Sequence, residues 1–319
     1  MKARLALFSF LACCAALAQD YPTRTVTIIV PYPAGGPTDQ LARQIASKFS
    51  EKLGQSFIVE NVSGGGTTIG TGRVARAAPD GYTLLLHNLQ ISANVALYPK
   101  LPYDTEKQLT PVAFINRNPL VLIGRKSLAP NTLGELVAYM KGTSASMAHP
   151  GSGSTGHLAT SLLAQEARLT VLQVPYRGGA PMVQDILGSH VDLLFGTPQQ
   201  LAPLVAAGQV KAYGITAKET YRQFPGAASL VAELGPKLEI FYWHALFAPV
   251  ATSKPTIDKL NAVLRGVLED PALVKSWADI GVSPYPQNER SPEAAQALMR
   301  AEVARWSQVV RENNIQPSQ

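Results

Sequence analysis

A glycine pair near the start of the chain, placed directly after an apolar run, forms the pattern best suited to hold an anion. The β-branched run at residues 25–30 predicts a buried strand. Gly35-Gly36 follows, and glycine lets a backbone turn with its N–H groups facing inward. Pro37-Thr38-Asp39 is typical of the first turn of a helix. Because a helix N-terminus offers free N–H groups and partial positive charge, this turn predicts a site for a carboxylate or a phosphate.

A second glycine loop, Gly151 to Gly156, has the same build. It lies between a short predicted strand at residues 146–148 and a predicted helix at residues 157–168. A third turn follows the predicted strand at residues 171–174, and its Arg177 carries the guanidinium that pairs bidentately with a carboxylate. Histidines also stand at strand ends facing the expected cleft, where they would hydrogen-bond a carboxylate or stack on a ring. Together these observations predict a binding site that uses both halves of the chain.

Motifs for catalysis are largely missing. Gly151-x-Gly153-x-x-Gly156 fits a dinucleotide fingerprint, but the next strand ends in Pro175-Tyr176-Arg177 where an acidic residue is needed. An NADP-binding enzyme that uses Arg177 therefore stays only a minor alternative. The chain has no nucleophile elbow, Ser-x-x-Lys pair, His-Glu-x-x-His or P-loop lysine motif. Its five histidines have unrelated spacings. We therefore expect no catalytic residue, no metal site and no cofactor.

Alternating strand and helix patterns must position these turns. Residues 25–30, 57–62 and 82–86 predict strands, and helical patterns follow Gly36 and the Gly64-Gly65-Gly66 turn. Residues 112–115 and 120–123 are two apolar runs with no helix between them, which is typical of a chain that leaves one domain for another. The second block repeats the strand and helix alternation up to residue 216. The long apolar segment 238–250 then predicts the return, and three helices complete the chain. Residues 116–119 and 241–246 are the predicted hinges, with Tyr242 and Trp243 interpreted as hinge packing.

Length and composition fit an exported two-domain protein. A chain of 319 residues exceeds what one core usually fills. Its 46% hydrophobic and 16% charged residues predict a well-buried globule, and the formal charge of +6 is scattered, so we expect no nucleic-acid binding. Residues 1–18 read as a signal peptide, with Lys2 and Arg4 before an apolar run and Ala16-Leu17-Ala18 at its end. Both cysteines lie inside this segment, and a lipid anchor on Cys13 is the alternative to simple export.

Several segments resemble one known family, the Bug-type substrate-binding proteins of tripartite tricarboxylate transporters. The resemblance spans nearly the whole chain after residue 20. The matching segments are Tyr21-Pro22, Pro33-Ala34-Gly35-Gly36 with Asp39 and Ala42-Arg43, residues 75–84, Leu101-Pro102-Tyr103-Asp104, Val174-Pro175-Tyr176-Arg177-Gly178 and Leu260-Asn261. Their order and spacing make the resemblance specific.

The resemblance implies a fold and a function. The fold is α/β, a two-domain periplasmic binding protein of type II, or Venus flytrap. Each domain is a mostly parallel sheet flanked by helices, and two crossover strands join them. We expect domain 1 at residues 19–117 and 243–319 and domain 2 at residues 118–242. The implied function is a monomeric, non-enzymatic periplasmic protein that closes on a small carboxylate and delivers it to a membrane permease. A ligand sensor for a signalling partner is the alternative.

Family members hold one ligand carboxylate on the first-strand loop and the other ligand end on loops of the second domain. The sequence departs from the family pattern at His87-Asn88-Leu89-Gln90 and at His149. The identity of the carboxylate therefore stays open, with a slight preference for an aromatic or planar dicarboxylate. The predicted ligand-binding residues are Tyr32, Ala34, Gly35, Gly36, Thr38, Asp39, Gly65, His87, Asn88, His149, Ser152, Ser154, Thr155, Tyr176, Arg177 and Gly178.

Overall fold

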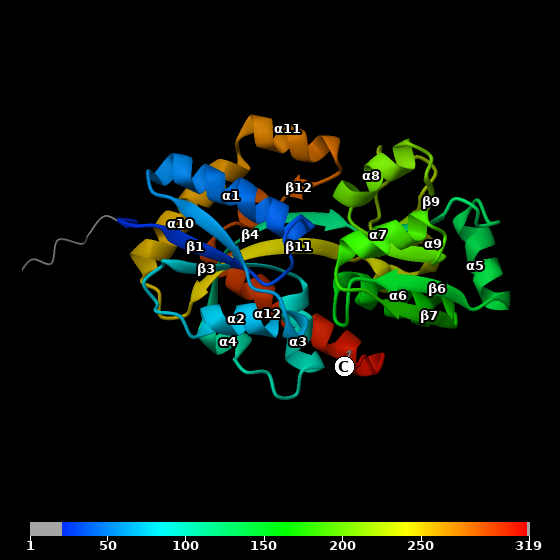
Figure 1. The fold of residues 1–319 in the computed structure, drawn as a ribbon, viewed down its shortest axis with the longest axis horizontal. Helices are drawn as coiled ribbons and strands as arrows, with labels where there is room; N and C mark the ends of the chain where they lie inside the picture. Colours follow the sequence, from blue (N-terminus) through cyan, green and yellow to red (C-terminus); the bar gives the residue numbers. More distant parts are fainter. Residues whose placement is uncertain (1–20, 318–319) are drawn as a thin grey trace, which may run out of the picture.

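Two six-stranded sheets, each covered by helices on both faces, make up the fold in the computed structural model (Figure 1). The structure describes residues 21–317, so the predicted signal peptide lies outside the described residues. The predicted α/β architecture of two layered sheets is confirmed. No helix in the described part of the chain has the length and apolar character needed to cross a membrane.

The first sheet has the strand order β12-β4-β11-β3-β1-β2. Its strands are β1 (Val26–Val30), β2 (Phe57–Asn61), β3 (Thr83–Asn88), β4 (Leu109–Pro119), β11 (Phe241–Pro249) and β12 (Ser283–Pro284). β1 runs parallel to β2 and β3, whereas β11 is antiparallel to both β3 and β4. One face packs against α1 (Pro37–Leu53), α10 (Lys254–Leu268) and α11 (Pro271–Asp279). The other face packs against α2 (Thr68–Ala75), α3 (Gln90–Leu97) and α12 (Pro292–Glu312).

The second sheet has the strand order β10-β9-β5-β8-β6-β7. Its strands are β5 (Val121–Arg125), β6 (Ala145–His149), β7 (Val171–Pro175), β8 (Leu193–Gly196), β9 (Val210–Ile215) and β10 (Ala228–Ser229). β6 is parallel to β7 and β8, and β5 is antiparallel to β8 and β9. The helices are α5 (Leu133–Gly142), α6 (Thr155–Ala167), α7 (Gly179–Leu187), α8 (Pro198–Ala206) and α9 (Leu230–Leu234). The short helices α4 (Thr105–Gln108), η1 (Gly65–Thr67), η2 (Pro236–Leu238) and η3 (Gln287–Glu289) complete the chain.

The chain passes between the sheets at Leu120 and again at Ile240. The predicted hinge segments 116–119 and 241–246 lie in β4 and β11, and their residues pair from Phe241 opposite Pro119 to His244 opposite Asn116. Thr216 holds both passages, because its Oγ1 accepts from Leu120 N at 2.7 Å and donates to Ile240 O at 2.6 Å. Its backbone also bonds Leu120 O and Ile240 N. The predicted hinge segments are therefore sheet, and the crossing is confined to single residues beside Thr216.

Candidate functional site

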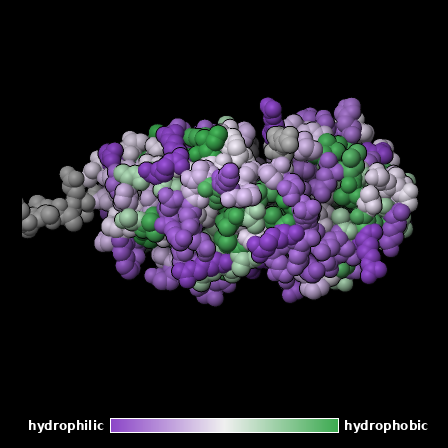
Figure 2. All heavy atoms as spheres, turned by 90° about the horizontal axis from the view of Figure 1, so that it is seen from below, coloured by the Kyte–Doolittle hydropathy of each residue, from purple (hydrophilic) through white to green (hydrophobic). Residues whose placement is uncertain are grey.

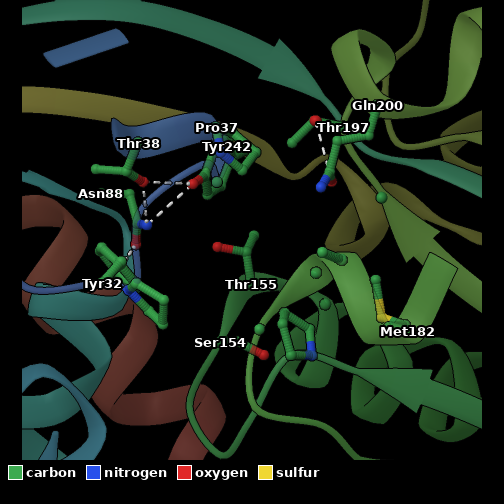
Figure 3. A pocket seen from close by; sticks show the side chains of 18 of the residues that line it. Tyr32, Pro37, Thr38, Asn88, Ser154, Thr155, Met182, Thr197, Gln200 and Tyr242 are labelled. Atoms are coloured by element: carbon green, nitrogen blue, oxygen red, sulfur yellow. Dashed lines mark hydrogen bonds between the residues drawn. The ribbon is translucent and has the colours of Figure 1, made fainter. Parts of the chain in front are cut away.

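A cavity of about 320 Å³ opens between the two sheets. It is lined by residues 32–38, 154–156, 177–182 and 195–197, with Asn88, Gln90, Leu120, Pro150, Gln200 and Tyr242. Figure 3 shows Tyr32, Asn88 and Thr38 on one side of this space and Ser154, Met182 and Gln200 on the other. Figure 2, which shows another face of the molecule, has purple and green residues interspersed over both halves of the surface. The cavity, rather than a surface patch, concentrates the predicted site residues.

Four helices begin at the cavity wall. α1, α6, α7 and α8 follow directly after the parallel strands β1, β6, β7 and β8, and such strand ends share one edge of their sheet. Three of these helices, α1, α7 and α8, have no side chain capping the first turn. Pro37 and Pro198 carry no N–H group, but other N–H groups of these first turns have no side-chain cap and can meet a ligand, and each N-terminus adds partial positive charge. The wall is built to hold anions from both sheets.

Two glycines shape the turns that lead into α1 and α7. Gly35 has φ +85° and Gly178 has φ +107°, a region that residues with a Cβ adopt at a cost. Nothing lies within 4 Å of a Cβ built on either residue, so the backbone conformation, and not space, requires glycine there. The glycine pattern read from the sequence therefore has a direct structural reason.

A hydrogen-bond network supports the first-sheet side of the cavity. Asn88 Nδ2 donates to Tyr242 Oη at 2.9 Å and to Thr38 Oγ1 at 3.2 Å, and these two hydroxyls are 3.1 Å apart (Figure 3). Tyr32 Oη donates to Asn88 Oδ1 at 2.7 Å, and His244 Nε2 lies 3.1 Å from Thr38 Oγ1. The side chains of this wall thus satisfy one another, which leaves the α1 backbone N–H groups to meet a ligand.

Asp39 organises the first loop from behind the cavity wall. Its side chain is only 3% exposed and accepts from Gly35 N at 2.9 Å and from Asn61 Nδ2 at 2.9 Å. It also pairs with Arg43 at 3.0 Å. Burial alone would raise the pKa of Asp39, but the hydrogen bonds from Arg43, Gly35 and Asn61 outweigh burial and lower it. Asp39 therefore stays ionised and holds the loop, and it does not line the cavity.

His87 and His149 are buried beside the cavity rather than on its wall. His87 is fully buried, accepts from Asn88 N at 2.8 Å and packs edge-on against Tyr32. His149 stacks on His157 with ring centroids 4.3 Å apart and lies 3.0 Å from Gly151 O. Burial lowers the pKa of His87 to about 3 and also lowers the pKa of His149. Both are neutral residues that support the loops.

The predicted site residues therefore fall into two groups. Most line the cavity: Tyr32, Ala34, Gly35, Gly36, Thr38, Asn88, Ser154, Thr155, Arg177 and Gly178. The remainder are placed off the wall: Asp39, Gly65, His87, His149, Ser152 and Tyr176. Tyr176 Oη instead donates to Asp185 Oδ2 at 2.5 Å, and Gly65 belongs to η1.

Sequence reasoning left out part of the second-sheet wall and part of the first-sheet side. The residues it missed include Gln90, Leu120, Met182, Phe195, Thr197, Gln200 and Tyr242. Gly196-Thr197-Pro198 is a strand end followed by a helix start, the same signal as Gly36-Pro37-Thr38, and reading it would have placed Thr197 at the site. Tyr242 was assigned to hinge packing but reaches the cavity, whereas Trp243 packs on Phe114 with ring centroids 4.6 Å apart.

Thr155 is the one cavity-lining side chain in the described residues whose buried hydroxyl has no hydrogen-bond partner. It is 5% exposed, and Figure 3 shows it extending from α6 into the space between the two sides. Burying an unpaired hydroxyl costs free energy unless a ligand or water completes the bond. Arg177, also on this side, makes no ion pair with any described residue.

Comparisons with known proteins agree with this architecture. A profile described as "Tripartite tricarboxylate transporter family receptor" matches residues 41–315. The periplasmic binding protein BugD is 34% identical with a TM-score of 0.86, covering 93% of this chain and 100% of its own. An R. palustris protein solved with adipate is 32% identical with a TM-score of 0.86, covering 94% and 100%. MatC from Rhodopseudomonas palustris, solved with malate, is 35% identical with a TM-score of 0.84, covering 91% and 100%.

Proposed function

The chain belongs to the tripartite tricarboxylate transporter receptor family, and from that premise we propose that it captures a dicarboxylate in the cavity between its two sheets. As a Bug-type member of a receptor family, it is a solute-binding protein for carboxylates and not an enzyme. The solved relatives with adipate and with malate support a ligand that carries two carboxylates.

The observation that carries the proposal is the convergence of helix N-termini from both sheets on one cavity. One carboxylate would accept from the uncapped backbone N–H groups that follow Pro37 at the start of α1. The other would accept from Thr155 Oγ1 and from the starts of α7 and α8, with Arg177 adding positive charge. A ligand with one charged end could satisfy only one of these two sides.

Such a ligand favours the closed arrangement because only there do both sides contact it. Contacts already link the halves beside the cavity: Gln90 Nε2 donates to Ser152 O at 3.1 Å and Gln199 Nε2 to Gln40 Oε1 at 2.8 Å. We propose the two units predicted from the sequence as the moving units, with their boundaries shifted to the passages, so that residues 21–119 with 241–317 form one unit and residues 121–239 the other. The passages at Leu120 and Ile240 would absorb the motion.

The family membership also supports the setting of this function. We propose that the protein works in the periplasm after removal of residues 1–18, and that it hands its ligand as a monomer to the membrane permease of a tripartite tricarboxylate-type transporter. The comparisons concern receptors of this system, so the permease is the partner we infer.

Titration calorimetry on unfolded and refolded protein, which removes any ligand carried through purification, tests the proposal. Adipate and hexanoate form a matched pair, because they have the same chain length and differ in the second carboxylate. We expect adipate to bind and hexanoate to bind at least about 100-fold more weakly, since losing one charged hydrogen-bonding end costs roughly 3 kcal/mol. If succinate, malate, glutarate and adipate all fail to bind, or hexanoate binds as tightly as adipate, the proposal is wrong.

A further inference from the structure

A row of contacts joins the two units beside the cavity but outside its lining. From the first unit, residues 21–119 with 241–317, it involves α1 and the end of α11. From the second unit, residues 121–239, it involves the start of α8 and the loop that contains Gln223. Figure 1 shows α1, α11 and α8 along the same upper side of the molecule. These contacts are made only while the two units lie together, so they bear on the closing of the cavity.

The second unit supplies a hydrogen-bond donor to the end of α11. Ala278 and Asp279 belong to the last turn of this helix, where carbonyl groups lack the amide partners that the helix interior provides. Gln223 Nε2 donates to Ala278 O at 2.8 Å and lies 3.4 Å from Asp279 O. A side chain of one unit thus caps a helix of the other, and separation of the units would break this cap.

The turn after α11 packs directly on the start of α8. Gly281 has φ +75°, and a Cβ built on it would lie 3.0 Å from the Cβ of Pro198, closer than an ordinary van der Waals contact. Pro198 opens α8 and stands between two residues that line the cavity, Thr197 and Gln200. The negative end of the α11 dipole therefore lies near the positive end of the α8 dipole, an arrangement that favours the contact.

A pair of glutamines ties α8 to the loop that precedes α1. Gln199 Nε2 donates to Gln40 Oε1 at 2.8 Å, and Gln40 Nε2 donates to Gly35 O at 3.1 Å. Gly35 lines the cavity, whereas both glutamines lie outside the lining. The starts of α1 and α8, which the proposed function assigns to opposite ends of the ligand, are thus linked by a hydrogen-bonded path outside the cavity.

We propose that these contacts form an outer clasp, which holds the starts of α1 and α8 at the spacing of the closed state and slows ligand release. The outer clasp consists of Gln40, Pro198, Gln199, Gln223, Ala278 and Gly281. The inference rests on the proposed function, because it concerns the closing of the same cavity. No member of the outer clasp lines the cavity. Changing a member should therefore act on the release rate of the ligand and much less on its entry.

Glutamine variants test the hydrogen bonds of the outer clasp. Gln223→Ala removes the cap from α11, and Gln199→Ala removes the bond to α1. We expect each to speed ligand dissociation about 2- to 10-fold, the range of one net hydrogen bond, and to leave the association rate within about 2-fold of the wild type. Gln287→Ala is the matched control, because Gln287 Nε2 donates to Glu269 Oε1 at 3.0 Å inside the first unit. It should leave both rates unchanged.

Glycine variants test the packing of the outer clasp. Gly281→Ala places a methyl group against Pro198, whereas Gly54→Ala meets nothing within 4 Å. Both glycines have similar positive φ, +75° and +68°, so the backbone strain of the two variants is matched. We expect similar decreases in melting temperature, but only Gly281→Ala should weaken ligand affinity, by at least about 5-fold. The glutamine variants still test the inference if Gly281→Ala does not fold.

Stopped-flow tryptophan fluorescence measures both rates, with Trp277 on α11 next to the outer clasp. The probe is whichever of succinate, malate, glutarate and adipate the refolded wild type binds most tightly. Wild-type dissociation rates in both Gln223→Ala and Gln199→Ala would overturn this inference while the proposed function stands. So would an effect of Gln287→Ala equal to theirs, or equal losses of affinity in Gly54→Ala and Gly281→Ala. A wild type that binds none of the four acids overturns the proposed function, and this inference with it.

Discussion

At the scale of single residues, a substitution at Thr155 should separate ligand affinity from stability most clearly. Its buried hydroxyl has no hydrogen-bond partner among the described residues, and we propose that it donates to a ligand carboxylate. Thr155→Val keeps the shape and removes the hydroxyl. We expect it to weaken adipate binding by roughly 10- to 100-fold, because a hydrogen bond to a charged group contributes about 1.5 to 3 kcal/mol. Calorimetric titration measures the change.

Thr160 supplies the matched control on the same helix. Its hydroxyl is also buried and unpaired among the described residues, but it does not line the cavity. Thr160→Val and Thr155→Val should both leave the melting temperature unchanged or raised, because each removes an unsatisfied buried hydroxyl. Only Thr155→Val should reduce the affinity. Equal affinity in Thr155→Val and wild type would remove Thr155 from the site.

Arg177 is exposed in the structure, and this exposure limits its contribution to ligand affinity. A charge pair formed there is screened by solvent and salt, in contrast to a buried one. We expect Arg177→Ala to weaken adipate binding only about 2- to 5-fold at 0.15 M salt. The effect should shrink as salt is raised, whereas Arg300→Ala on α12, away from the cavity, should change nothing. An affinity in Arg177→Ala that equals the wild type at low salt would show that Arg177 does not meet the ligand.

Buried neutral histidines predict a loss of stability in acid. Burial lowers the pKa of His87, His157 and His244 to about 3, below the ordinary value of 6.5. The unfolded chain therefore binds protons first, so stability is full above pH 6.5 and falls as the pH drops towards 3. Each such histidine lowers the unfolding free energy by about 1.4 kcal/mol for every pH unit below 6.5, down to about pH 3.

Urea unfolding at pH 7 and pH 5 checks this. His157→Gln removes one of these titrations while its amide can still accept from Gly153 N, which now donates to His157 Nδ1. Between pH 7 and 5, the wild type should lose about 2 kcal/mol more unfolding free energy than His157→Gln. A wild-type free energy that does not change between the two pH values would contradict the neutral assignment of these rings.

At the scale of elements, the crossing between the sheets depends on Thr216. Its hydroxyl and backbone bond both Leu120 and Ile240, and the residue is fully buried. Thr216→Val leaves the N–H of Leu120 and the carbonyl of Ile240 without their side-chain partner. We expect a loss of about 2 to 4 kcal/mol in unfolding free energy, from two buried groups left unsatisfied. Faster hydrogen exchange should appear at the amide of Leu120.

Thr216→Ser is the control, because it keeps the hydroxyl and loses only a methyl group. It should retain slow exchange at Leu120 and most of the stability. If the Leu120 amide in Thr216→Val exchanges as slowly as in the wild type, Thr216 does not hold the passage.

Strand and helix starts could be predicted from the sequence because they depend on local signals. Apolar runs, glycine turns and proline at the first helical turn identified the ends of β1, β6 and β7, where much of the cavity lies. The direction in which each side chain of β3 points was harder to predict from the sequence. His87 and Asn88 were both predicted to face the ligand, but neighbours on a strand point to opposite faces, so Asn88 reaches the cavity and His87 is buried.

Pairing between distant segments was also beyond local patterns. Residues 116–119 were interpreted as part of the passage between domains because no helix separates the two apolar runs, yet β11 pairs with them along the full length of β4. The second-sheet wall formed by Met182, Phe195 and Gln200 depends in the same way on how β6, β7 and β8 are ordered in their sheet. These parts of the site depend on tertiary packing, so they could not be predicted from a single sequence.

At the scale of the whole molecule, one core links the two sheets. The buried cluster that contains Phe114 and Trp243 of the first sheet continues to Leu122 and Phe195 of the second. α12 joins this core, and its Glu302 accepts from Trp243 Nε1 at 2.6 Å and from Trp306 Nε1 at 2.9 Å. The halves are therefore connected on one side and separated by the cavity on the other, which is the arrangement a closing receptor needs.

The central claim is that one dicarboxylate is held at both ends, by helices from both sheets. A crystal structure of the refolded protein with adipate tests it most directly. The account predicts one carboxylate within hydrogen-bond distance of the backbone N–H groups at the start of α1, and the other within hydrogen-bond distance of Thr155 Oγ1. Adipate with both carboxylates on the same sheet's helices, or bound outside the cavity, would contradict it.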